Sequence, residues 1–145
     1  MKKVIKFSFM MAMFCIAVMG CSKSGLTGKS DAKLSPPSWI QGDWGYEDHN
    51  SVFFKFTNDD VLMNIGVLTS LKSIYGYSIL GTGTTLKETK NNSSEYELKV
   101  TATVAGKEEA AGRFHFRKVD ATHIEAGTNE EGDAIYNYEV LVKKN

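Results

Sequence analysis

The sequence predicts an all-β domain, an antiparallel meander of about eight short strands that closes into a small barrel. Two observations predict this class. Beyond Pro37, apolar side chains recur at every second position over most of the chain, as they do in strands with one buried and one solvated face. Short turn sequences separate these runs, so consecutive strands should pair as hairpins. A two-sheet sandwich fits the same pattern and is the alternative architecture.

The first 20 residues are predicted to be a lipoprotein signal peptide. Three lysines within the first six residues precede an apolar run of 13 residues, from 7 to 19, which is too short for a membrane span of about 20 residues. The run leads into Val18-Met19-Gly20-Cys21, which matches the bacterial lipobox. Proteins with this motif are cut before the cysteine, and its thiol carries a diacylglyceryl group. Cys21 is therefore the predicted lipid attachment site. The attached lipid is expected to include fatty acids such as palmitate. An ordinary signal peptide with a chance cysteine is the alternative.

Gly28-Lys29-Ser30 offers a rival interpretation, a phosphate-binding loop. That loop needs a further glycine five residues before Gly28, where this chain has Lys23, and it joins a strand to a helix. Here a predicted signal peptide precedes and prolines follow, so nucleotide binding is not expected. Cys15 would leave with the signal peptide, so after cleavage Cys21 would be the last cysteine and its thiol would be lipidated.

Residues 21–38 are expected to form a flexible tether, because serine, glycine, lysine and two prolines dominate them. In the bacterial lipoproteins that this N-terminus resembles, an aspartate after the cysteine can mean retention in the inner membrane; Ser22 follows Cys21 here, so the resemblance favours the outer membrane. Acidic residues do not follow the cysteine directly, which favours the periplasmic face over the cell surface. The expected location is thus the cell envelope, where the lipid on Cys21 would anchor the protein to the membrane.

Residues 39–145 are predicted to form one folded domain. A mature chain of 125 residues is long enough for one core and too short for two. Without the three signal-peptide lysines, 14 basic side chains face 17 acidic ones. The net charge of about minus three argues against a nucleic-acid partner.

Alternation assigns an inward face to each predicted strand. The strands fall at 39–46, 52–57, 61–65, 95–104, 110–119, 123–126 and 134–142, with a hairpin signal at Asn58-Asp59. The side chains predicted to face inward are Ile40, Trp44, Tyr46, Val52, Phe54, Phe56, Tyr96, Leu98, Val100, Ala102, Val104, Phe114, Phe116, Tyr136, Tyr138, Val140 and Val142.

One segment, 66–76, departs from this alternation. Leu68, Leu71 and Tyr75 recur at spacings of three and four, which predicts a short helix or one helical turn over the barrel mouth. A functional interpretation makes the segment a lid or a recognition element. The structural alternative is an amphipathic plug that closes one end of the core.

A resemblance enters at Pro37-Ser38-Trp39-Ile40-Gln41-Gly42-Asp43-Trp44. This G-x-W motif on the first strand, behind a proline-bearing lead-in, resembles the opening of lipocalin-like barrels of the calycin group. With the tether, F-x-F and T-H-I, the chain from 36 to 145 looks like a small lipocalin-like lipoprotein. The resemblance implies that Gly42 and Trp44 are structural, with Trp44 closing the narrow end of the barrel beneath an arginine of a late strand. The chain offers Arg113 and Arg117 for that role.

Residue constellations for catalysis are missing from the sequence. His49 lies in a predicted turn, and His115 and His123 fall on two neighbouring predicted strands, which does not amount to three or four converging metal ligands. The acidic pairs sit at predicted turns, where carboxylates are solvated, rather than across a cleft. The sequence therefore predicts a protein that is not an enzyme, with no cofactor.

Two binding functions follow from these expectations. The first is capture of a small apolar ligand inside the barrel or at its mouth, near 66–80. The candidate pocket residues are Phe54, Phe56, Tyr96, Phe114, Phe116 and Tyr138. The alternative is a protein-binding module, a proteinase inhibitor that protects the envelope from a secreted protease. Its candidate partner-binding loop carries Leu68, Leu71, Tyr75 and Tyr77. An assembly role without a ligand is a third possibility.

Overall fold

The structure, a computed structural model, describes residues 32–76, 78–79, 82–129 and 137–145. Within these residues the chain forms ten strands and one short helix. In chain order they are β1 (Gly42–Gly45), β2 (Phe54–Phe56), β3 (Val61–Asn64), β4 (Leu68–Ser70), α1 (Leu71–Tyr75), β5 (Ser78–Ile79), β6 (Thr82–Asn91), β7 (Glu95–Val104), β8 (Lys107–Lys118), β9 (His123–Asn129) and β10 (Asn137–Lys144).

All ten strands belong to one antiparallel sheet with the order β4-β3-β2-β1-β10-β9-β8-β7-β6-β5. Consecutive strands pair from β1 to β4 and from β5 to β10, and the first strand also pairs with the last, Trp44 lying opposite Lys143. The open edges are therefore β4 and β5, and α1 is the segment that connects them. The predicted all-β meander with a short helix within 66–76 is confirmed.

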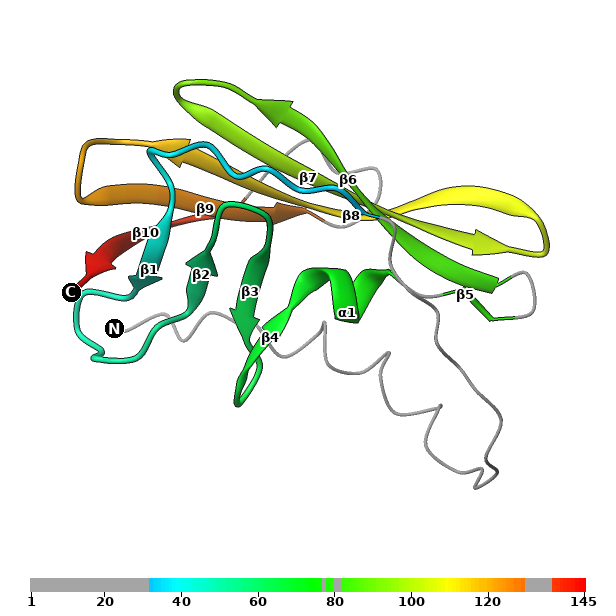
Figure 1. Cartoon of the computed structure of the whole chain (residues 1–145), viewed down its shortest axis with the longest axis horizontal. Coiled ribbons are helices and arrows are strands. Elements are labelled where there is room, and N and C mark those ends of the chain that lie inside the picture. The colour runs from blue at the N-terminus through cyan, green and yellow to red at the C-terminus, as the bar shows by residue number, and fades with distance from the viewer. Residues whose placement is uncertain (1–31, 77, 80–81, 130–136) are drawn as a thin grey trace.

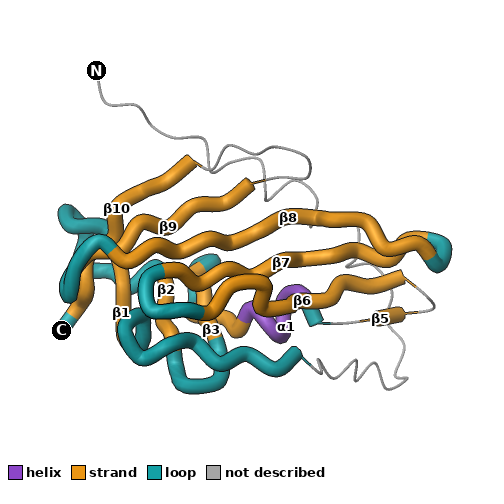
Figure 2. Tube along the Cα trace, turned by 90° about the horizontal axis from the view of Figure 1, so that it is seen from above, coloured by secondary structure: helices purple, strands orange, loops and turns teal. Residues whose placement is uncertain are grey.

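The sheet curls into a half-barrel. Figure 1 shows the long strands β6 to β8 on one side of the molecule and β2, β3, β4 and α1 on the other. Figure 2 shows β10, β9, β8, β7 and β6 side by side in that order, with the β7–β8 hairpin projecting beyond the body. Register shifts in β6, between Glu88 and Lys90, and at the Val100–Thr101 position of the β7–β8 pair assist the curl, because β-bulges bend a strand and increase its twist.

The core fills the concave side. Its fully buried side chains come from both walls and from the helix, so the half-barrel is packed against itself. The largest of them are Trp44, Tyr96, Phe56, Phe114, Phe116, Ile40, Leu71, Leu98, Ile124, Leu141 and Val61. Burial of such side chains contributes about 1.5–3 kcal/mol each, which makes this interior the main source of stability.

The predicted inward face of β10 is wrong. Leu141 is 1% exposed and Glu139 lines the interior, whereas Val140 is 54% exposed. Alternation favours the face with Tyr138, Val140 and Val142 over the face with Leu141, and a shift of one residue exchanges the two faces. The pairing of Trp44 with Lys143 on β1 selects the face that carries Leu141.

The lead-in segment before β1 packs against the rest of the fold. Leu34 is 5% exposed and packs in the core. The backbone amide and hydroxyl of Ser35 donate to the carboxylate of Glu88 on β6, and the Asn91 amide donates to the Ser35 carbonyl at 2.8 Å. The described part of the domain therefore begins by residue 34.

Candidate functional site

Five of the six predicted pocket residues meet in one aromatic cluster on the concave side. They are Phe54, Phe56, Tyr96, Phe114 and Phe116, each at most 3% exposed. The ring centroids of Phe56 and Phe116 lie 4.9 Å apart and those of Phe54 and Phe116 lie 5.1 Å apart, with edge-to-face planes. These contacts are within the favourable range for aromatic pairs, so the protein's own rings fill most of the concave side where a ligand pocket is expected.

Tyr138 lies on the opposite face of the sheet, so the sixth predicted pocket residue is not near the other five. Its hydroxyl hydrogen-bonds His115 Nδ1 at 2.6 Å, and the Arg117 guanidinium lies 3.7 Å from its ring centroid. Gly127 stands between His115 and Tyr138 in the register of β8, β9 and β10. Because glycine has no side chain, the imidazole and the phenol can meet across it.

A polar row on this outer face was not predicted as a buried feature. Glu97 and His115 are each 4% exposed although their positions alternate with core residues. Thr89 donates to the Glu97 carboxylate at 2.7 Å. Burial, followed by the charge of Lys90, lowers the pKa of His115 and outweighs the nearby carboxylates, which favours the neutral imidazole.

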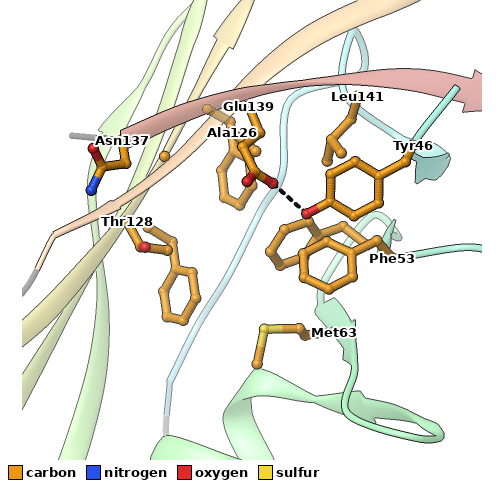
Figure 3. Close-up of a pocket in the computed structure, with 12 residues that line it drawn as sticks. Tyr46, Phe53, Met63, Ala126, Thr128, Asn137, Glu139 and Leu141 are labelled. Carbon is orange, nitrogen blue, oxygen red and sulfur yellow. Dashed lines mark hydrogen bonds between the residues drawn. The ribbon is translucent and has the colours of Figure 1, made fainter. Parts of the chain in front are cut away.

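A cavity opens between the β1–β2 connection and strands β9 and β10 (Figure 3). Its volume is about 20 Å³ by the space open to the centre of a water molecule, enough for about one water-sized group. None of the described residues that line this cavity belongs to 66–80, the segment near which an opening is expected. The lining residues are Tyr46, Phe53, Phe54, Met63, Phe114, Phe116, Ala126, Gly127, Thr128, Asn137, Glu139 and Leu141.

Apolar and polar groups occupy different parts of this cavity. Phenylalanines and Met63 supply the apolar wall, and the polar side comes from Thr128, Asn137 and Glu139 of β9 and β10. In Figure 3 the Glu139 carboxylate points to the Tyr46 hydroxyl, which donates a hydrogen bond to it. An apolar cavity with a few convergent polar groups is the usual form of a small-molecule site.

Tyr46 is held in its protonated form. Burial, the hydrogen bond to Glu139 and the negative charge of Glu139 all raise the pKa of Tyr46. Its ring also packs on Phe53, with centroids 5.4 Å apart, and Phe53 packs on Phe54 at 4.9 Å. Tyr46 therefore connects the rim carboxylate to the aromatic wall and fixes the direction in which Glu139 points.

Two of the four residues of the predicted partner-binding loop pack in the core or against it. Leu71 of α1 is fully buried, and the Tyr75 ring lies 5.9 Å from that of Phe114. Leu68 of β4 is half-buried, and Tyr77 lies outside the described residues. The side chains of α1 that the structure describes therefore favour the plug over a recognition element, because its largest apolar groups point inward.

Gly42 and Trp44 form the structural motif expected of the first strand, with one correction. Trp44 is fully buried and its indole donates to the Ile40 carbonyl at 2.6 Å. The cation above its ring is Lys143 of β10, at 5.5 Å from the centroid, and not Arg113 or Arg117. Gly42 has φ +122°, and a Cβ there would lie 3.0 Å from Lys143 Cε, so this position requires glycine.

Two of the residues that define the cavity escaped prediction. Glu139 sits on the face of β10 that alternation assigns to solvent. Phe53 precedes the inward-facing Phe54, so alternation assigns Phe53 to solvent as well. The signal that could have found Glu139 is the pairing of the first and last strands expected in a barrel, which puts odd-numbered residues of 139–143 inward.

Neither the comparisons nor the described residues add a second candidate site. No family model, curated protein or solved structure matches the chain. Within the described ranges, no three His, Cys, Asp or Glu side chains converge as metal ligands, and no helix is long and apolar enough to span a bilayer. Cys21, the predicted lipid attachment site, lies outside these ranges.

Proposed function

We propose that this chain is a lipid-anchored, non-enzymatic binding protein of the cell envelope that holds a small apolar ligand at the mouth of its lipocalin-like half-barrel. The observation that carries the proposal is the cavity at Tyr46 and Glu139, where an aromatic wall meets a polar rim. Because the cavity holds only one water-sized group, the ligand inserts a small part and lies mainly against the rim.

The pairing of the first and last strands supports the lipocalin-like part of the proposal. A buried tryptophan of β1 beneath a cationic side chain of the last strand corresponds to the arrangement that the G-x-W resemblance implies, with lysine in place of arginine. The half-barrel and its short closing helix are consistent with the same family.

The anchor is tested by the fate of Cys21. Cells that express the chain are grown with labelled palmitate, and the purified protein is compared with a Cys21→Ala variant. We expect the label and membrane association in the native chain and neither in the variant. A labelled variant, or an unlabelled native chain, contradicts the lipoprotein assignment.

Ligand binding is tested with an organic extract of the host envelope added to the ¹⁵N-labelled full chain in a non-ionic detergent. We expect amide shift changes concentrated at Ala126, Thr128 and Leu141, which line the cavity, and none at Glu108 on the projecting hairpin. Changes spread evenly over the exposed surface would indicate detergent-like association and contradict a defined site.

A proteinase inhibitor is the second candidate, and one observation favours it. The β3–β4 hairpin tip exposes Ile65 (53%) and Val67 (69%), on either side of Gly66. Apolar side chains at a loop tip suit insertion into a protein groove. The native chain would then silence a protease secreted by its host, and an Ile65→Asp, Val67→Asp variant would not; unchanged proteolysis with the native chain removes this candidate.

A further inference from the structure

Glu139 is the charged group of the cavity. Of the described residues that line it, Glu139 alone is an acidic or basic residue, and it is half-buried rather than fully exposed. The Tyr46 hydroxyl donates to Oε2. A carboxylate has about four acceptor positions, so one phenol leaves most of its hydrogen-bonding capacity unused.

No basic side chain of the described residues neutralises this carboxylate. The ion pairs among these residues do not involve Glu139. The two lysines that follow on β10 are engaged elsewhere. Lys143 lies over Trp44, and Lys144 Nζ donates to the carbonyls of Tyr46 and His49, each at 2.7 Å.

The space beside Glu139 suits a small cation. A volume of about 20 Å³ accepts one water-sized group, and a primary ammonium is of that size. The neighbouring rings of Tyr46, Phe53 and Phe54 follow one another at 5.4 and 4.9 Å, and aromatic faces attract cations within about 6 Å. A carboxylate beside several rings is therefore a better partner for an organic ammonium than for a neutral or anionic group.

We infer that the ligand of this site is a small organic amine, bound with its ammonium group against Glu139 and its apolar part over the partly exposed rings of Tyr46 and Phe53. The inference rests on the proposed function, since it names the chemical class of the ligand held at the mouth. Glu139 supplies the charge and charge-assisted hydrogen bonds, and Tyr46 positions the carboxylate. A neutral molecule of the same shape keeps the apolar contacts and loses the ionic ones.

The test compares two probes of matched shape, benzylammonium and benzyl alcohol, on the ¹⁵N-labelled full chain in one non-ionic detergent. Amides of Ala126, Thr128 and Leu141 report occupation of the cavity. We expect benzylammonium to bind at least about tenfold more tightly than the alcohol. In Glu139→Gln, which keeps the shape of the side chain, the two affinities should become equal while that of the alcohol is unchanged.

Two variants control for charge and fold. Glu108→Gln removes the same charge from the exposed part of β8 and should keep the tenfold preference. Tyr46→Phe removes the phenol that orients the carboxylate and should weaken the preference for the ammonium without abolishing it, which gives a second measurement if Glu139→Gln unfolds. Equal affinities in the native chain, or a preference that survives in Glu139→Gln, overturn the inference and leave the binding site standing. If neither probe shifts the cavity amides, the inference and the proposed function both fail.

Discussion

At the scale of the residue, Glu88 ties the lead-in segment to the sheet. Burial acts to raise its pKa, but hydrogen bonds from Ser35, Tyr96 and Asn91 outweigh burial and lower the pKa of Glu88 below its ordinary value of 4.5. A carboxylate with a depressed folded-state pKa contributes stability that is present above the unfolded pKa. That contribution is lost as the pH falls through the lower folded value.

We therefore predict that Glu88→Gln lowers the free energy of unfolding at pH 7 by about 1–2 kcal/mol, a figure reduced for the partial exposure of the carboxylate. The variant should also lose less stability than the native chain between pH 5 and pH 3. Urea unfolding at both ends of this range measures the two effects. Glu108→Gln is the matched control, and equal acid sensitivity of the two variants would refute the role of Glu88.

His115 provides a second prediction at the scale of the residue. Here the folded state favours the neutral form of the side chain, whereas for Glu88 it favours the charged form. Because its folded pKa is lowered by burial and by Lys90, the folded state holds the neutral ring. Its contribution to stability is present above the unfolded pKa of about 6.5 and is lost as the pH falls from there toward the folded pKa. In an NMR titration the ring signals of His115 should have a midpoint below 6.5. A midpoint above 6.5 would mean that the carboxylates of Glu95 and Glu97 dominate instead.

At the scale of the element, β1 depends on a close passage between Gly42 and Lys143. Gly42→Ala imposes both an unfavourable positive φ and a contact at 3.0 Å with Lys143 Cε, so we predict a loss of about 1–3 kcal/mol. Gly66→Ala is the control, because Gly66 has φ +107° with open space around its Cβ position. It should cost less, and Lys143→Ala should restore part of the loss in the Gly42→Ala chain. Equal losses of unfolding free energy for Gly42→Ala and Gly66→Ala in urea would show that the positive φ alone destabilises the Gly42 variant, without a contribution from the contact with Lys143.

The helix α1 gives the second element-scale prediction. If α1 closes the core, Leu71→Ala removes a fully buried side chain and costs about 2–5 kcal/mol. Leu68→Ala, at a half-buried position of β4, should cost clearly less. Thermal or urea unfolding compares them. A Leu71→Ala chain as stable as the native one would mean that the helix is held loosely and is available to a partner.

At the scale of the whole molecule, stability should vary along the long strands. The middle of β8, around Phe114 and Phe116, lies in the packed interior, whereas the hairpin end from 104 to 109 is exposed. Because local opening is easiest where few apolar contacts must break, backbone amides of the β7–β8 hairpin end should exchange with deuterium much faster than those of 114–116. Uniform protection along β8 would contradict this gradient.

The sequence predicts the class of this molecule better than its details. The strongly alternating segments, such as Phe54 and Phe56 or Tyr96 and Leu98, give the correct buried faces because only one assignment buries their apolar groups. Strand β6 was not predicted, since its polar, threonine-rich sequence has Leu86 as its one described core residue. Pairing with β7 creates this strand, and a pairing partner is invisible to local patterns.

The candidate site is predictable from the sequence only where local alternation decides which face is buried. The aromatic wall follows from alternation, but the position of Glu139 depends on the register of β10 against β1 and β9. Tyr138 shares its face of the strand with Val140 and Val142, so alternation predicts that face as the inward one. The pairing across Gly127 instead gives Tyr138 its partner His115 on the outer face, and that long-range contact cannot be seen in one strand alone.

The most direct test of the central claim is the native mass of the protein released gently from its own membrane. We expect the mass of the mature lipidated chain plus one further small organic molecule in one-to-one ratio, and no such molecule on the same chain refolded without envelope components. A chain that carries its lipid and nothing else, or that leaves the membrane with a protein partner in place of a small molecule, would contradict it.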